Sequence, residues 1–315
     1  ALLLTLAGCG FGGTAPGQEA ERITELPRQL SASEREVIRA GNRFAFDLLG
    51  RVVADEGTEN VFLSPLSASM ALGMTMNGAD GATWSQMRDV LGFAGLSQDE
   101  INASYRSLLE LLVGLDPAVE TTVGNSVWIR DGFPVEADFR DRVREHFDAR
   151  VENLDFGDPA AAGTMNDWVR EATDGRIDGI VQPPVDPLTT VFLINAVHFD
   201  ARWTRRFEPD ATRDAPFRRP DGSTVQVPLM TRTMEVSHVQ DEEVAAVDLP
   251  YGGEAFSMTV LLPAEGRTVA DVVLKADSEL VPMSLRSATE DEIETAGTNY
   301  EQAAITVESP IPEVR

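Results

Sequence analysis

The chain has 315 residues, which is enough to bury one large core or two ordinary ones, and it carries a formal net charge of −26 at pH 7. Because such a surface repels phosphate backbones, we expect no nucleic-acid binding. Cys9 is the only cysteine, so the chain can form neither an intramolecular disulfide nor a Cys-x-x-Cys metal or redox site.

The chain begins with ALLLTLAGCG, a short apolar run that ends in small residues before Cys9. This pattern is typical of a secretory segment and its cleavage site. Leu6, Ala7, Gly8 and Cys9 resemble a bacterial lipoprotein signal, which implies that Cys9 is lipidated; an apolar N-terminus with a chance cysteine is the alternative. We expect residues 1–8 to be a signal-peptide remnant. The protein is then an extracellular, membrane-anchored lipoprotein that reaches the membrane only through Cys9.

The folded part is expected to begin with a helix. Residues 11–22 are rich in Gly, Pro and Glu, so we expect residues 9–35 to consist of the lipidated Cys9 and a flexible linker. Phe46, Leu49 and Val53 then share one face at helical spacing, which predicts a helix over residues 36–54.

A second helix start is marked by Ser64-Pro65, where a capping hydroxyl precedes a proline at the first helical position. The segment LSASMALGMTM (66–76) is small or apolar almost all round, so we expect its helix to be buried. A short strand is expected just before it, at NVFLSP (60–65).

Two further helices are predicted from capping boxes, one formed by Thr83 and Gln86 and one by Ser97 and Glu100. In each, a side-chain oxygen accepts from the backbone three residues later. The pattern then predicts, in chain order, a strand at 121–132, a helix at 139–147, a strand at 151–156 and a helix at 165–172.

The later part of the chain reads as strands. VFLINAVHF (191–199) is a buried strand by its composition, yet Asn195 stands in its middle. Turn residues inside 217–230 and 244–263 predict two hairpins. Helices followed by strands favour an α+β fold over a doubly wound sheet. Beyond Leu274 the sequence is polar and predicts at most one helix and one short strand.

Sequence signals of catalysis are weak. No Gly-x-Ser-x-Gly nucleophile turn and no phosphate-binding Gly-x4-Gly-Lys loop occurs, and His146, His198 and His238 lie far apart. A Ser-His-Asp triad stays open, because its members meet only in the fold. Asn102 starts an Asn-Ala-Ser glycosylation pattern, but inside a predicted helix, so we interpret it as chance. We expect no enzyme activity, metal site or cofactor.

Four separated segments together resemble the serpin family of protease inhibitors. Within 191–230, the most specific of them, the Asn-Ala pair at Asn195 is followed by Trp203, Phe207 and a Pro-Asp-Gly turn. The four segments, in order and at sensible spacing, are residues 61–93, 165–181, 191–230 and 247–263. The resemblance implies a serpin domain over residues 36–270, with helices packed on a large central β-sheet and additional smaller sheets.

The resemblance also implies roles for four residues. Asn195 would lie on a central strand of the main sheet, in a polar shutter cluster with Ser64 and Ser67, where the sheet parts to admit a new strand. Trp203 would lie at the breach, where an inserting loop first enters. The alternative is that Asn195 is a satisfied core amide and Trp203 ordinary core packing.

The implied activity is inhibition of serine, or also cysteine, proteases by a suicide-substrate mechanism. A target protease cleaves an exposed reactive loop and forms an acyl-enzyme, and insertion of the loop into the sheet then distorts the protease. The partner is a protease, with no cofactor. The alternatives are a non-inhibitory serpin-fold binding protein outside the cell or an unrelated surface lipoprotein.

The sequence departs from the family after the second hairpin. The reactive loop, its hinge and the closing core strands are not recognisable, so no bait residue can be named. The histidine that the family places beside the shutter asparagine is missing too. We expect residues 271–315 to be a divergent or truncated tail of a fragment or frame-altered chain.

Overall fold

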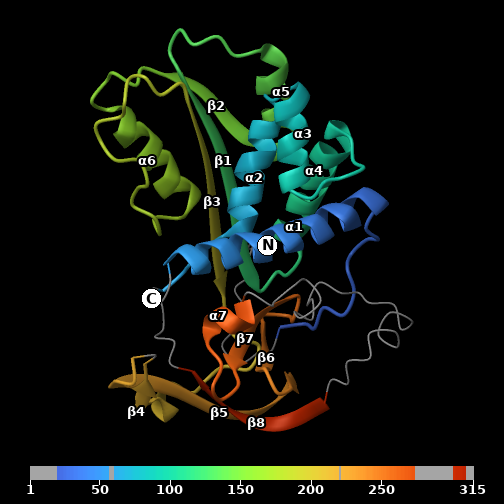
Figure 1. Cartoon of the computed structure of the whole chain (residues 1–315), viewed down its shortest axis with the longest axis vertical. Helices are drawn as coiled ribbons and strands as arrows, with labels where there is room; N and C mark the ends of the chain where they lie inside the picture. The colour runs from blue at the N-terminus through green and yellow to red at the C-terminus, as the bar shows by residue number, and fades with distance from the viewer. Residues whose placement is uncertain (1–19, 57–59, 220, 274–300, 310–315) are drawn as a thin grey trace, which may run out of the picture.

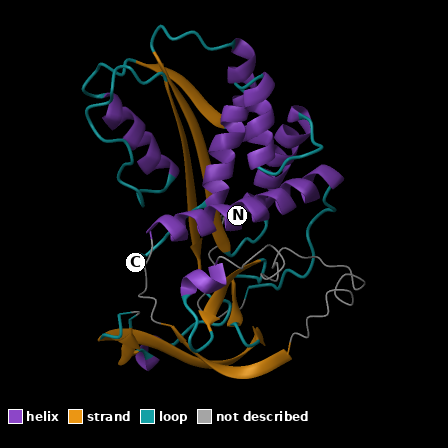
Figure 2. Cartoon of the chain, in the orientation of Figure 1, coloured by secondary structure: helices purple, strands orange, loops and turns teal. Residues whose placement is uncertain are grey.

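The computed structural model describes residues 20–56, 60–219, 221–273 and 301–309 (Figure 1). Helices dominate the first half of this part and strands the second, which makes the fold α+β (Figure 2). The helices are α1 (Ala32–Glu56), α2 (Pro65–Met76), α3 (Gly81–Val90), α4 (Gln98–Gly114), α5 (Ala137–Phe147), α6 (Ala161–Ala172), the short 3-10 turn Pro209–Ala211, and α7 (Val269–Val273). The strands are β1 (Val119–Arg130), β2 (Ala149–Leu154), β3 (Val191–Ala201), β4 (Arg213–Arg218), β5 (Thr224–Gln240), β6 (Val244–Tyr251), β7 (Phe256–Pro263) and β8 (Glu301–Ser309).

The described strands form two sheets. The first has the order β2-β1-β3, with β1 parallel to β2 and antiparallel to β3. The second has the order β4-β5-β6-β7, and β8 pairs with β5. The large central sheet of the sequence analysis is thus represented here by three strands. The two predicted hairpins are confirmed, since β4 pairs antiparallel with β5 and β6 pairs antiparallel with β7.

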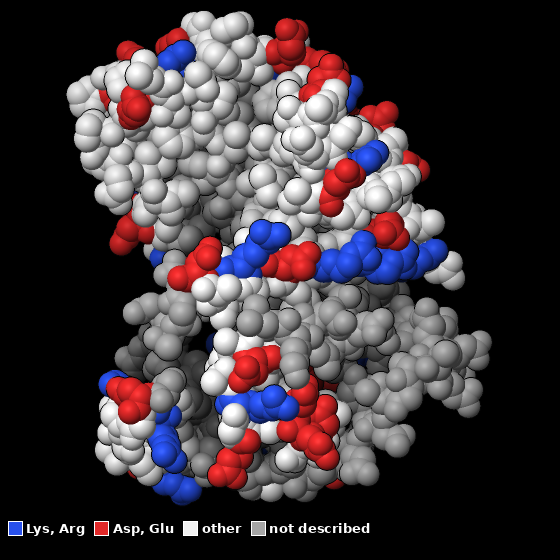
Figure 3. All heavy atoms as spheres, in the orientation of Figure 1, with Lys and Arg blue, Asp and Glu red and all other residues white. Residues whose placement is uncertain are grey.

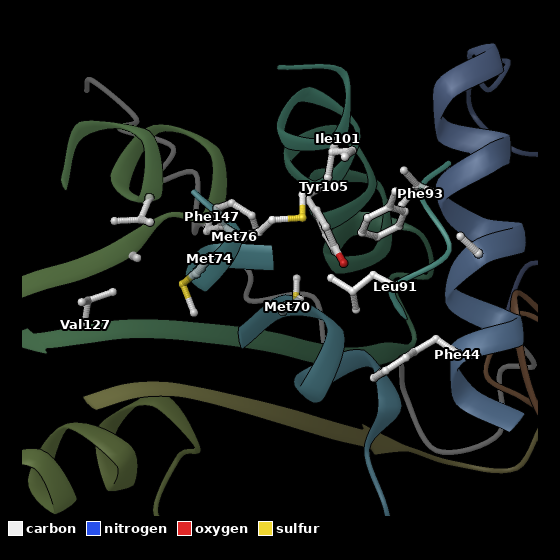
Figure 4. Packing of buried hydrophobic residues seen from close by; sticks show 14 of the residues in the cluster. Phe44, Met70, Met74, Met76, Leu91, Phe93, Ile101, Tyr105, Val127 and Phe147 are labelled. Carbon is white, nitrogen blue, oxygen red and sulfur yellow. The ribbon is translucent and has the colours of Figure 1, made fainter. Parts of the chain in front are cut away.

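Helices cover both faces of the first sheet. Alternate residues of a strand point to opposite faces, and here both sets include buried apolar residues. On one face Val127 and Ile129 of β1 join the main core, which includes Met70 and Met74 of α2 and Phe147 of α5 (Figure 4). On the other face the alternate strand residues pack against α6. The sheet is therefore held between α2 and α5 on one side and α6 on the other.

Helix α6 lies unusually close to β1 because Gly124 has no side chain. A Cβ atom at Gly124 would lie 3.0 Å from the Cβ of Ala172 and 3.3 Å from the ring of Trp168. Trp168 and Val169 are buried, so α6 contributes an apolar face to the sheet at this point. Any larger residue at Gly124 would push the helix away.

The predicted helix starts have mixed outcomes. Ser64 caps α2 and Pro65 is its first residue, as predicted, and Ser97 and Glu100 form the predicted capping box of α4. The box predicted from Thr83 and Gln86 is wrong. Asp80 caps α3 instead. It directly precedes the first helical residue, Gly81, and its carboxylate accepts from the backbone N–H of Gly81.

The strand predicted at residues 60–65 is also wrong. Residues 60–64 belong to no strand, and the side chain of Phe62 is 98% exposed. A strand forms only by pairing, and none of the described strands pairs with this segment.

The outer surface carries both signs of charge. Basic and acidic side chains follow one another along α1 (Figure 3), where Arg39 pairs with Glu36 at 2.6 Å. No helix in the described ranges is both long and apolar enough to cross a bilayer.

Candidate functional site

The strand that carries Asn195 has one open edge in the described part of the chain. β3 pairs with β1 along its whole length, and none of the described strands pairs with its other side. In an antiparallel pair only alternate residues bond to the neighbour, so the others direct their backbone N–H and C=O groups outward. This edge can take up a further strand. The resemblance implied a central strand, whereas β3 is the outer strand of the sheet as described.

Asn195 faces a second asparagine across the sheet. Its Cα is in register with that of Asn125 on β1, and its Nδ2 donates to Oδ1 of Asn125 at 2.8 Å. Asn125 is buried, and its own Nδ2 donates to the backbone oxygen of Phe147 at 2.8 Å. The two amides therefore link β3, β1 and the end of α5.

The polar link is incomplete at Asn195. Its Oδ1 is buried and has no hydrogen-bond partner among the described residues. Its Nδ2 lies 3.5 Å from the sulfur of Met70 on α2, which is a weak acceptor. Leaving a buried acceptor unpaired costs about 1–3 kcal/mol, so this oxygen is unfavourable for the stability of the sheet at the centre of β3.

The two predicted serines lie together at the start of α2. The Oγ of Ser64 donates to the Oγ of Ser67 at 2.8 Å and accepts from the backbone N–H of Ser67 at 3.3 Å. Within the described residues no hydrogen bond joins either serine to Asn195. Met70 of α2, three residues after Ser67, contacts Asn195. The structure thus brings the two serines together, but the hydrogen-bond partner of Asn195 is the amide of Asn125 instead of a serine.

Trp203 lies just beyond the end of β3 and joins the two sheets. Its ring stacks on Tyr251 of β6 with centroids 4.3 Å apart, and it meets Phe207 edge to face at 6.1 Å. The backbones of Trp203 and Tyr251 form an isolated β-bridge, and the N–H of Thr204 donates to the oxygen of Pro250 at 2.9 Å. The exit of β3 is therefore fixed to the β6–β7 hairpin.

The titratable groups with the largest pKa shifts have structural partners. Burial raises the pKa of Tyr105 to about 12, and its hydroxyl donates to the backbone oxygen of Ser69 at 3.0 Å. Burial also raises the pKa of Glu34, but hydrogen bonds from Arg28 and Ser31 outweigh it and lower that pKa to about 2. No group of three His, Cys, Asp or Glu side chains in the described ranges is placed to hold a metal ion.

Two other residues singled out in the sequence are Cys9 and Asn102. Cys9 lies outside the described residues. Asn102 is fully buried and exchanges hydrogen bonds of 3.0 and 2.7 Å with the side chain of Asn77. A glycan could not reach it in the folded chain, so the chance interpretation of its motif agrees with the structure.

Sequence reasoning missed Asn125 and Tyr251. The signal for Asn125 was present, since GNSVWI places an amide inside an otherwise apolar strand, as VFLINAVHF does. Only the register of β1 with β3 tells that the two amides meet. Tyr251 precedes the Gly-Gly turn, and nothing in its local sequence indicates a stacking partner 48 residues earlier.

Comparisons with known proteins agree with this geometry. The family model described as "Serpin (serine protease inhibitor)" matches residues 39–298. An uncharacterized serpin-like protein of Thermococcus kodakarensis is 36% identical over 241 residues, covering 74% of this chain and 54% of that protein. Leukocyte elastase inhibitor of Bos taurus is 31% identical over 258 residues, covering 80% of this chain and 68% of that protein.

The chain belongs to the serpin family. A crystal structure of reactive-loop-cleaved human thyroxine-binding globulin has a TM-score of 0.77 at 24% identity and covers 89% of this chain and 80% of that chain. This likeness confirms the predicted serpin-like α+β fold. The chain spans little more than half the length of the Thermococcus relative.

Proposed function

We propose that this chain carries the strand-accepting sheet of a serpin-type protease inhibitor. The observation that carries the proposal is the edge of β3 that no described strand covers, with the Oδ1 of Asn195 at the centre of the strand buried and unpaired among the described residues. A relative named leukocyte elastase inhibitor, 31% identical, supports inhibition. The target class is serine proteases, with cysteine proteases as an extension.

The inhibitor itself needs no catalytic residue. The nucleophile of the protease attacks the scissile carbonyl of the reactive loop, the amine of the new N-terminus leaves, and an acyl-enzyme forms. The freed loop then pairs with β3, where each new backbone hydrogen bond replaces a bond to water. Insertion carries the acylated protease away and disturbs its active site before water can release it.

The amides give β3 a way to accept a neighbour. A bond between two side-chain amides can exchange partners when strands shift, whereas interlocked apolar side chains resist. The unused Oδ1 of Asn195 lowers the stability of the present arrangement. The mechanism requires a sheet whose free energy falls when a further strand is added.

The site of action in this proposal is the cell surface. Cys9 becomes lipidated, and residues 10–19 act as the linker that holds the inhibitor away from the membrane, because residues 20–31 pack against the fold and α1 begins at Ala32. The support is the run Leu6-Ala7-Gly8-Cys9, which matches a lipoprotein signal at every position.

The test uses the full-length gene product and a panel of trypsin, chymotrypsin, elastase, subtilisin and papain. We expect at least one of these proteases to form a complex that survives boiling in dodecyl sulfate and has the summed mass. The matched control is the same protease with its nucleophile replaced by alanine, which should form no such complex. Cleavage of the loop by every protease with no stable complex would contradict inhibition and favour a binding role.

A further inference from the structure

Residues 20–31, directly before α1, belong to no helix or strand, yet they are fastened at both ends. We call residues 20–31 the N-terminal strap. Near its start the backbone N–H of Ile23 donates to the oxygen of Gly253 at 2.7 Å. Beside it Nε of Arg22 lies 2.6 Å from Oε2 of Glu254. This end of the strap is therefore held by the turn between β6 and β7.

The other end of the strap is held by the helices. Arg28 makes two hydrogen bonds to the carboxylate of Glu34 on α1, at 2.6 and 3.0 Å. The same guanidinium donates to the backbone oxygen and the Oγ of Ser107 on α4, at 3.1 and 2.7 Å. Glu34 is buried and also accepts from the backbone N–H of Ser31 at 2.6 Å. A two-pronged ion pair with a buried carboxylate fixes geometry better than an exposed pair does.

The turn that holds the first end also holds the exit of β3. The N–H of Gly252 donates to the oxygen of Arg202 at 2.8 Å, and Oγ1 of Thr204 donates to the oxygen of Gly252 at 2.9 Å. The N–H of Gly253 donates to the buried carboxylate of Asp116, just before β1, at 2.8 Å. Segments from four parts of the chain thus meet at this turn.

We propose that the N-terminal strap is a latch that restrains the exit of β3 relative to α1 and α4. Its two fastenings span from the helical layer to the turn on which Trp203 and Thr204 rest. Any displacement of this turn away from the helices must break one of them. The strap therefore resists movement at the end of the strand that has the open edge. Its consequence for strand uptake rests on the proposed function, whereas the restraint itself does not.

Hydrogen exchange tests the restraint directly. In Arg22→Gln/Arg28→Gln we expect backbone amides at residues 202–204 and 251–254 to exchange faster than in the wild type, by roughly threefold or more. Amides of α6, which the strap does not contact, should be unchanged. The matched control is Arg39→Gln, which removes an ion pair contained within α1. Equal exchange at the turn in the double variant and the wild type would overturn the latch.

A milder pair of variants covers the case in which the double variant does not fold. Arg22→Gln and Glu254→Gln each remove one charge of an ion pair in which the Arg22 side chain is 72% exposed, so both should fold. Each should speed exchange at residues 251–254 by the same factor, and the two changes combined should add nothing further. Independent, additive effects would contradict a shared fastening.

A second arm asks whether the latch governs strand uptake. In the full-length gene product, we measure the rate at which the cleaved loop becomes protected from exchange, in wild type and in Arg22→Gln/Arg28→Gln. A faster rate in the variant supports the latch, and an unchanged rate beside faster exchange at the turn removes its regulatory role. No loop protection in the wild type would defeat the proposed function, while the exchange results at the turn would still decide the restraint.

Discussion

Asn125 and Asn195 lie directly opposite each other on β1 and β3, and the Nδ2 of Asn195 donates to the Oδ1 of Asn125 at 2.8 Å. The Nδ2 of Asn125 in turn donates to the backbone oxygen of Phe147. Asn125 thus has two satisfied groups, whereas Asn195 has one strong bond and one buried oxygen without a partner in the described part of the chain. The two amides are chemically identical but contribute differently to stability.

The first prediction separates these two asparagines. Asn125→Ala leaves the oxygen of Phe147 and the amide of Asn195 unpaired, so we expect a loss of about 2–3 kcal/mol in the free energy of unfolding. Asn195→Ala also removes an unsatisfied oxygen, so its loss should be about 1 kcal/mol. Urea unfolding of both variants measures the difference. A larger loss for Asn195→Ala would contradict the assignment of partners.

The second prediction concerns the stack between Trp203 and Tyr251. Trp203→Ala removes contacts with Tyr251 and Phe207 at the junction of the two sheets, so we expect a loss of about 3 kcal/mol. Phe62→Ala is the control, because that ring is 98% exposed and should change stability by less than about 0.5 kcal/mol. Chemical denaturation compares the two. Similar small losses would show that the stack is incidental.

The third prediction is a pH dependence set by Glu34. Its pKa is about 2 in the folded protein against 4.5 for the free group, so the folded state favours the charged form. Its contribution to stability is complete above pH 4.5 and is lost as the pH falls towards 2. Glu34→Gln should therefore be less stable than the wild type at pH 6, and the gap should shrink near pH 2.5. Urea midpoints at both pH values measure it.

The control for Glu34 is Glu110→Gln. Glu110 forms an exposed pair with Arg106 on α4, and its side chain is 64% exposed. We expect it to track the wild type at both pH values, because exposed pairs contribute little. A gap between wild type and Glu34→Gln that stays constant from pH 6 to 2.5 would argue against the buried ion pair.

The fourth prediction concerns the anchor. Cys9→Ser removes the only thiol in the chain, so the protein expressed with its natural leader should move from the membrane fraction to the soluble fraction. Labelling with a radioactive fatty acid should mark the wild type and leave Cys9→Ser unmarked. Equal labelling of both, or equal membrane association, would contradict lipidation at Cys9.

Local signals in the sequence predicted local structure well. Ser64-Pro65 and the Ser97–Glu100 box start the helices where expected, because a cap needs only residues a few positions apart. The box at Thr83 failed because Asp80 offered an earlier cap. The strand at 60–65 failed because strand formation depends on a partner from elsewhere in the chain.

The site was less accessible to sequence reasoning. The unusual composition around Asn195 was visible, but its partner lies 70 positions earlier, on a different strand. The same holds for the N-terminal strap, which falls inside the predicted linker of residues 9–35 and carries no periodic apolar pattern of a helix or strand. Its contacts with Gly253, Glu34 and Ser107 appear only when distant segments are packed together.

The central claim, that the sheet gains stability by accepting a strand at β3, is tested most directly by heating the full-length gene product before and after its exposed loop is cleaved. An added strand stabilises the sheet, so the account predicts that cleavage raises the unfolding temperature by roughly 10 °C or more. An unfolding temperature that stays the same or falls after cleavage would mean that no strand enters, and it would contradict the account.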